Sequence, residues 1–458
     1  MTHASAEDRA PEDRAAEDLA PEDLAVEDFA VAEEEVVGLC RDLIRIDTSN
    51  PTSDERKAAE YVAAKLSDAG IEPALLESAP GRAGVVARVP GADPSRGALL
   101  LHSHLDVVPA DASEWAVDPF SGEIIDGYLW GRGAIDMKDT VAVHLAMARE
   151  YGRTGRRPAR DLVFAFLADE EAGGTYGSKW IADKHRHLFD GVTEAIGEGG
   201  GFSYPLDDTR RLYPIENAQR GQAWLRLTAR GRAGHGSSPN DENAVTALAD
   251  TLSRIGHHRF PIHLIDSVRA LLERVAELRG VAFDPADVEG SLDRLGPDVR
   301  DLVEVVLRNS ANPTMMEAGY QINVIPGRAS AGIDGRFLPG QEDAFLAELD
   351  TLLDPAVSRE FVHRDIAMET AYDGRLVAAM EDALRAEDPD GHPTPYCNPG
   401  GTDAKAFSRL GIRCYGFKGL RMPHDLDYGR LFHGVDERVP VDGLTFGVRV
   451  HRRLLAAC

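Results

Sequence analysis

Cysteine is scarce in this sequence. The chain of 458 residues has four cysteines, and none stands in a Cys-x-x-Cys pair or at a spacing typical of a disulfide framework. Scattered thiols of this kind are typical of reduced proteins, which predicts a cytoplasmic location. The chain also lacks an uninterrupted apolar run that could span a bilayer, and its first residues show no signal-peptide pattern. We therefore expect neither a membrane span nor a secretory leader.

Positive charge is also in short supply. The 50 lysines and arginines are outnumbered by 77 aspartates and glutamates, which gives a formal net charge of -27. This excess disfavours nucleic acids and anionic membrane surfaces as partners. Residues 6–30 repeat an acidic pentad, and a period of five fits neither a helix nor a strand. We therefore expect an acidic disordered tail at residues 1–33, with binding to a basic partner as the alternative.

Apolar residues make up 43% of the chain, enough to bury a core, and the length exceeds that of one typical domain. Short apolar runs at residues 98–101 and 162–168 predict buried strands, and helical spacing between them predicts an α/β fold. From about residue 216 the pattern changes to alternating strands and a long helical stretch. We expect three folded parts: 34–215, an inserted smaller α+β domain at 216–370, and the first domain resumed at 371–458.

Polar residues follow the first predicted strand directly. His104 and Asp106 lie two residues apart, so they share one face if the strand continues. Open α/β sheets bind ligands at the carboxyl ends of their strands. A histidine beside a carboxylate is typical of a metal ligand with the partner that orients it. A purely structural histidine–aspartate pair is the alternative.

Acidic residues follow other apolar segments in the same way. Glu170 and Glu171 come after the run at 162–168, Glu198 precedes a glycine pair, and Asp136 lies in a glycine-rich loop before a predicted helix. Adjacent acids at the end of a buried strand are costly unless a cation or protons compensate them. The alternatives are a solvated turn and, for Asp136, a helix cap.

Two imidazoles and three carboxylates thus emerge from loops at strand ends. This donor set suits two borderline cations such as Zn²⁺, provided that one carboxylate bridges them. A further acid beside a ligand is what the activation of a metal-associated water requires. The candidate ligands are His104, Asp136, Glu171, Glu198 and His433, and the further acid is Glu170.

Six motifs occur in a fixed order along residues 104–437. They are His104-Leu105-Asp106-Val107-Val108-Pro109, Gly131-Arg132-Gly133 with Asp136-Met137-Lys138, Asp169-Glu170-Glu171, Gly234-His235 with Pro239, Asn323-Val324-Ile325-Pro326, and His433-Gly434 with Glu437. In this order and spacing the sequence from about residue 35 onward resembles the M20 family of metallopeptidases and deacylases. That family includes acetylornithine deacetylase, succinyl-diaminopimelate desuccinylase, aminoacylase and carboxypeptidases.

The resemblance implies a zinc-exopeptidase-like mixed sheet flanked by helices, with the inserted domain acting as a lid and dimerisation domain. It implies two Zn²⁺ ions, with Co²⁺ or Mn²⁺ as alternatives. Asp136 would bridge the metals, with His104 and Glu198 on one and Glu171 and His433 on the other. One departure is Asp139, where relatives often have a small residue.

The resemblance also implies roles outside the metal ligands. Glu170 resembles the general base, Asp106 the residue that orients His104, and His235 the residue that stabilises the oxyanion. In dimeric relatives this histidine reaches into the partner's active site. The expected substrate contacts are Asn323, Arg336, Gly400, Gly401 and Thr402, since the guanidinium of Arg336 can bind a carboxylate through two hydrogen bonds.

The expected reaction is cleavage of the amide bond of a small peptide or an N-acyl amino acid that bears a free carboxylate. The attacking water would lie between the metals, with Glu170 as general base. The long helical stretch at residues 261–308 favours a dipeptidase, carboxypeptidase or aminoacylase type, acting as a homodimer through the inserted domain. The alternatives are a catalytically silent binding or regulatory protein of the M20 fold and a dinuclear phosphoesterase.

Overall fold

The computed structural model describes residues 30–51 and 54–458. The predicted acidic tail lies outside the described residues, except for its last few positions. These open helix α1 (Ala30–Ile44), which therefore begins slightly before the expected start of the folded part.

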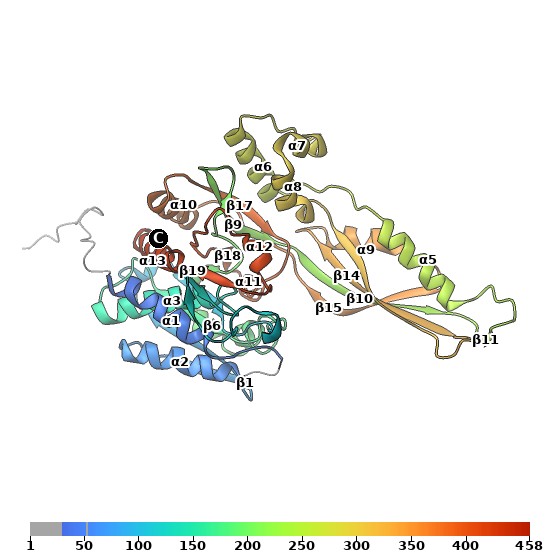
Figure 1. Cartoon of the computed structure of the whole chain (residues 1–458), viewed down its shortest axis with the longest axis horizontal. Helices are drawn as coiled ribbons and strands as arrows, with labels where there is room; N and C mark the ends of the chain where they lie inside the picture. Colours follow the sequence, from blue (N-terminus) through green and yellow to red (C-terminus); the bar gives the residue numbers. More distant parts are fainter. Residues whose placement is uncertain (1–29, 52–53) are drawn as a thin grey trace, which may run out of the picture.

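A mixed sheet forms the centre of the larger body (Figure 1). Its strands are β1 (Ala74–Ala79), β2 (Arg82–Val89), β3 (Ala98–His104), β6 (Leu162–Leu167), β7 (Val192–Gly197), β8 (Tyr204–Pro205), β9 (Arg211–Gln219), β16 (Met368–Glu369), β17 (Gly391–Asn398) and β18 (Arg413–Gly416). Their order is β1-β2-β6-β3-β7-β18-β9-β16, and β17 and β8 both pair with β9. β3 runs parallel to β6 and β7, whereas β2 is antiparallel to β6. The predicted mixed α/β sheet is confirmed.

Helices bury both faces of this sheet. One face packs on α1, α2 (Glu55–Asp68), α3 (Lys138–Thr154), α10 (Arg375–Glu387) and α13 (Val441–Ala457), and the other on α4 (Ser178–Lys184) and α11 (Ala404–Ser408). Leu99 and Leu101 of β3 belong to the first core, and Leu100 between them belongs to the second. Parallel strands that are covered on both faces need an unbroken apolar run, which explains the pattern seen in the sequence.

A second, four-stranded sheet extends away from the larger body (Figure 1). Its order is β12 (Ser310–Ala318), β14 (Arg328–Phe337), β10 (Gly221–Arg230), β15 (Val357–Asp365). Helices α5 (Ala244–His257) and α9 (Glu342–Thr351) share a core with it, and the short pair β11 (Gly234–His235) and β13 (Val324–Ile325) lies at its far end. The chain leaves the large sheet after β9 and returns at β16. We propose that the inserted domain is bounded near these two points, close to residues 216 and 370.

The helical stretch within the insertion packs on the larger body. Helices α6 (Asp266–Arg279), α7 (Val288–Leu295) and α8 (Pro297–Val303) share a core with Leu212 of β9 and Cys397 of β17. These helices therefore stand over the large sheet, although they lie between strands of the four-stranded sheet in the sequence.

The remaining elements join two distant loops. Strands β4 (Ile124–Ile125), β5 (Tyr128–Trp130) and β19 (Arg438–Pro440) form a small sheet, and α12 (Tyr428–Leu431) lies just before His433. Among the described residues no helix is both long and apolar enough to cross a membrane.

Candidate metal centre

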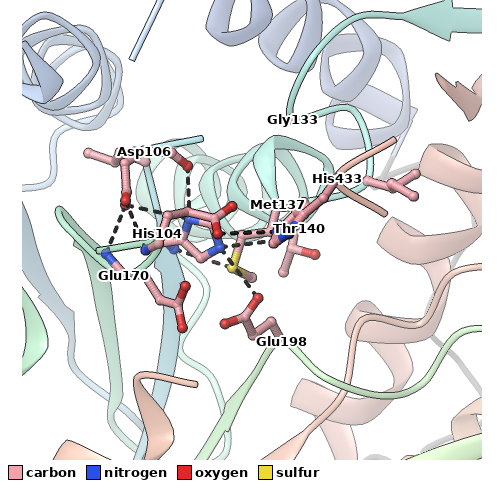
Figure 2. Close-up of polar contacts among 12 residues, drawn as sticks. His104, Asp106, Gly133, Met137, Thr140, Glu170, Glu198 and His433 are labelled. Carbon is pink, nitrogen blue, oxygen red and sulfur yellow. Dashed lines mark hydrogen bonds and ion pairs between the residues drawn. The ribbon is translucent and has the colours of Figure 1, made fainter. Parts of the chain in front are cut away.

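His104 is the last residue of β3 and is fully buried. The strand continues beyond the apolar run at residues 98–101, and its pairing with β6 extends to the partners His104 and Leu167. The ring Nδ1 of His104 lies 2.9 Å from the carbonyl oxygen of Asp106, which leaves Nε2 free to face the carboxylates (Figure 2). A histidine held through one ring nitrogen is typical of a metal ligand.

Asp136 lies between the two predicted histidine ligands. Its Oδ1 is 3.2 Å from Nε2 of His104, and its Oδ2 is 2.9 Å from Nε2 of His433. On the first side Glu198 approaches His104 Nε2 at 3.3 Å, and on the second Glu171 approaches His433 Nε2 at 3.2 Å. The five predicted ligands therefore form two halves that share one carboxylate.

The Asp106 carboxylate has three hydrogen-bond donors that the sequence did not reveal. It accepts hydrogen bonds from the backbone N–H groups of Glu170 at 3.1 Å and Glu171 at 3.0 Å, and from the side-chain amide of Asn50. The hydrogen bond between Asp106 and His104 comes from the backbone carbonyl oxygen of Asp106, because the Asp106 carboxylate lies 3.6 Å from Nδ1 of His104. Asp106 thus fixes the loop of the two glutamates as well as the histidine.

Glu437 holds the glycine-rich loop that carries Asp136. Its buried carboxylate accepts hydrogen bonds from the backbone N–H groups of Gly133, Ile135 and Asp136, at 3.1, 2.7 and 3.2 Å. It also accepts one from the Arg132 guanidinium at 2.7 Å. Since Glu437 follows His433 closely in the sequence, this contact ties together the loops of two ligands.

The electrostatics of the cluster indicate a site for a cation. Burial, with the charge of Glu198, raises the pKa of Glu170 far above its usual range, and burial together with Asp136 raises the pKa of Glu171 to about 7. Hydrogen bonds to Asp136 and Glu171 raise the pKa of His433 to about 10. Raised pKa values of buried acids and of the histidine beside them indicate an excess of negative charge, which a divalent cation would offset.

The donor set fits such a cation. Two groups of residues could each hold a cation: His104, Asp136 and Glu171 form the first, and His104, Glu170 and Glu198 form the second. Within each group, the potential ligand atoms all lie within 4.8 Å of one another. Oε1 of Glu171 is buried and has no hydrogen-bond partner among the described residues. Imidazole nitrogens with carboxylate oxygens are ligands that Zn²⁺ prefers.

A cavity of about 1210 Å³ opens onto this cluster. Four of the expected substrate contacts, Arg336 and the loop Gly400, Gly401 and Thr402, line it. A side chain at Gly401 would lie 2.5 Å from the amine of Lys405, so the glycine leaves room for this buried cation. The Thr402 hydroxyl accepts a hydrogen bond from Gln219 at 2.7 Å, and Thr402 therefore also shapes the loop.

Comparison with known proteins identifies the family. The model of peptidase family M20/M25/M40 matches residues 100–457. The chain belongs to this family. Aminoacylase-1 of Sus scrofa is 28% identical over 442 residues, which cover 93% of this chain and 95% of the relative. The chain is therefore a hydrolase that acts on amide bonds, and the resemblance inferred from the six motifs is confirmed.

Solved structures of M20 proteins share the fold. The M20 family metallo-carboxypeptidase Sso-CP2 from Sulfolobus solfataricus superposes with a TM-score of 0.71 at 17% identity, covering 92% of this chain and 99% of that one. Human carnosine dipeptidase 1 superposes with a TM-score of 0.63 at 17% identity, covering 94% of this chain and 98% of that one. The family is metal-dependent, and the structure contains candidate metal-binding residues.

Two residues that were predicted to act at the site, His235 and Asn323, do not line the cavity of their own chain. His235 and Asn323 are both exposed and lie together at the far end of the lid, where β11 pairs with β13 (Figure 1). The Nδ1 of His235 lies 2.8 Å from the hydroxyl of Ser237. Figure 1 shows this tip at the end of the extended domain that lies away from the large sheet, and His235 is not among the residues that line the cavity of its own chain.

Two buried acids beside the M20 site were not singled out from the sequence. Burial raises the pKa of Asp403 to about 7, and Glu198 adds to this effect. Burial raises the pKa of Glu216 to about 8, although hydrogen bonds from Gln219 and Asn398 oppose it. Asp403 directly follows the loop Gly400-Gly401-Thr402 that was predicted to contact the substrate, so its position in the sequence could have indicated that it lies near the site. Glu216 lies in β9, whose residues after Arg211 are all buried, and no pattern in the sequence marked it.

Proposed function

We propose that this chain is a dinuclear zinc-dependent hydrolase that cleaves the amide bond of a small peptide or an N-acyl amino acid with a free carboxylate. The observation that carries this proposal is the Asp136 carboxylate, which has one histidine on each oxygen. A carboxylate in this position can bridge two cations. His104 and Glu198 would hold one ion and His433 and Glu171 the other, with Co²⁺ or Mn²⁺ as alternatives to Zn²⁺.

The chain's own residues would carry the proton transfer. When bound, the metals supply Lewis acidity toward the scissile carbonyl and make water a stronger acid. Glu170 lines the cavity beside the ligands, and its backbone is fixed by Asp106. It would take the proton of the attacking water and return it to the leaving amine.

The free carboxylate of the substrate would face a group of cations. Lys179, Arg336 and Lys405 all line the cavity. Burial lowers the pKa of Lys405 to about 8, while the neighbouring Asp365 opposes this shift. The Arg336 guanidinium is held by Asp334 of its own strand at 2.7 Å, which fixes the direction in which it points. A fixed guanidinium beside amines is suited to a carboxylate.

We infer a homodimer in which a second copy completes the site. His235 and Asn323 lie outside the cavity of their own chain, so they are available to a partner. The edge strand β12 and the segment after it expose Met315, Met316 and Ile322, with Ile322 fully exposed. An exposed apolar edge strand is a surface for pairing with another chain.

We propose a cytoplasmic location as well, since all four cysteines, which lie in the described part of the chain, are free and buried.

Hydrolysis of a mixed panel of dipeptides and N-acyl amino acids, followed by mass spectrometry, tests the proposal. Zinc-loaded wild type is compared with Glu170→Gln, with a chelated sample, and with the exposed control Glu273→Gln. We expect cleavage by wild type and by the control only. Stoichiometric metal binding without cleavage of any substrate would favour the alternative of a catalytically silent M20 binding protein.

A further inference from the structure

Four aromatic rings form a continuous series along the wall of the cavity. Tyr396 of β17 meets Phe202 edge-on, with ring centroids 6.5 Å apart, and Phe202 stacks on Tyr428 at 4.3 Å. Tyr428 lies 6.0 Å from Phe432, whose ring stacks on that of His433 at 5.1 Å. All five line the cavity. We call the four rings Tyr396, Phe202, Tyr428 and Phe432 the aromatic ladder; it ends at a predicted metal ligand.

The helical insertion extends this wall with apolar side chains. Leu302 of α8 and Val305, in the turn that follows it, line the same cavity. Val305 is 49% exposed, so its side chain is accessible from the cavity that it lines. Tyr204 joins the insertion to the body, because its hydroxyl donates a hydrogen bond to the Asp298 carbonyl at 3.1 Å. The insertion is thereby positioned to contact the substrate.

The cations of the cavity form a separate group. Lys405 interacts electrostatically with Arg336 and Lys179, and Lys179 pairs with Asp365 at 2.8 Å. The aromatic ladder reaches the predicted metal cluster at His433, whereas Lys405 and Lys179 have Asp365 as their acidic neighbour. If the carboxylate of the substrate binds the cations and its scissile carbonyl lies at the metal cluster, its acyl group faces the aromatic ladder.

The size of the cavity leaves room for a large acyl group, and its charge restricts that group further. Its volume of about 1210 Å³ exceeds the range of about 300–1,000 Å³ that is usual for small-molecule sites. An acetyl group would leave the ladder exposed to water. Asp301, Asp425 and Asp427 also line the cavity, so a second carboxylate on the acyl side would be repelled.

We propose that this hydrolase acts on amides whose acyl group is large, uncharged and aromatic, and that the aromatic ladder with Val305 binds this group. Aromatic rings bind apolar and aromatic groups through buried area and through stacked or edge-on contacts. The proposal rests on the proposed amide hydrolysis, and it goes further by naming the substrate's acyl portion and the residues that select it.

The test compares N-phenylacetyl, N-acetyl and N-succinyl derivatives of one amino acid. We expect kcat/KM for the phenylacetyl substrate to exceed that for the acetyl substrate by at least about tenfold, with the succinyl substrate slowest. Equal values for the phenylacetyl and acetyl substrates would overturn the inference while leaving the proposed function intact. Failure to cleave any of the three, or any member of the wider panel, would instead contradict the proposed function.

Variants at Val305 assign the selectivity to this wall. Because Val305 is half-exposed, Val305→Asp should fold and should lower kcat/KM for the phenylacetyl substrate about tenfold, with little change for the acetyl substrate. Val305→Leu should keep the wild-type preference. Val31→Asp on α1 is the matched control, since Val31 is 48% exposed and does not line the cavity. An equal loss with both substrates in Val305→Asp would refute the assigned role.

Discussion

Glu437 offers a sharp test of how the metal centre is built. One oxygen of its carboxylate accepts hydrogen bonds from the N–H groups of Ile135 and Asp136, and the other accepts from Gly133 and Arg132. Glu437→Gln keeps the shape of the side chain but converts one oxygen into an NH₂ group. That group would then face two hydrogen-bond donors, and the buried Arg132 would lose its charged partner.

The expected loss of stability follows from these contacts. Removing one partner of a buried ion pair costs about 3–5 kcal/mol, and hydrogen bonds to a charged group contribute about 1.5–3 kcal/mol each. The two figures describe largely the same contacts, so they are not added. We expect Glu437→Gln to lower the free energy of unfolding of the metal-free protein by about 3–5 kcal/mol.

Metal affinity should fall as well, because the Asp136 backbone loses its anchor. Loss of a residue that supports a ligand typically weakens metal binding by about 10–100-fold. Urea unfolding of the metal-free protein and calorimetric zinc titration measure the two effects, with the exposed Glu273→Gln as the control. A change below about 1 kcal/mol together with unchanged zinc affinity would show that Glu437 does not hold the loop.

Three further predictions concern metal, acid and assembly. Chelation should abolish hydrolysis and lower the melting temperature, since a ligand that binds only the native state stabilises it; full activity after verified metal removal would contradict the proposed centre. Burial lowers the pKa of His451 to about 4, so the folded state resists protonation and its stability falls as the pH drops from about 6.5 to 4. The contribution of His451, about 3 kcal/mol when complete, should be missing in His451→Leu, so urea unfolding across that pH range should show a fall in stability that is smaller by this amount. The buried His102 and His144, whose pKa values are also lowered, account for the loss that remains. If His235 acts across a dimer interface, an equal mixture of the inactive variants Glu170→Gln and His235→Ala should recover up to about a quarter of wild-type activity, because one site of each mixed dimer has both residues intact. No recovery would show that His235 acts within its own chain or takes no part in catalysis.

Local patterns in the sequence were enough to predict the sheet and to single out most of the residues that the structure brings together as candidate metal ligands. The apolar runs of β3 and β6 predicted buried strands because a strand covered on both faces has no polar positions to alternate. The acids and the histidine at their ends then predicted ligands, since carboxyl ends of neighbouring strands meet at one edge. His433 was expected at a strand end as well, but in the structure it follows the short helix α12 instead.

The contacts that set the geometry of the centre depend on the tertiary structure. Glu437 bonds to Ile135 across 302 residues, and Asp106 bonds to Glu171 across 65. A carboxylate that accepts backbone hydrogen bonds leaves no periodic signal, because its partners are N–H groups that every residue other than proline carries.

The same limit applies to the larger arrangement. The sequence by itself determined which segments are helices and strands and which face of each is apolar. Only the tertiary structure decided that α6, α7 and α8 cover the large sheet, that the aromatic ladder ends at His433, and that His235 lies at the far end of the lid. Hydrophobic periodicity reports that a face is buried, whereas the surface it packs against depends on how whole elements dock.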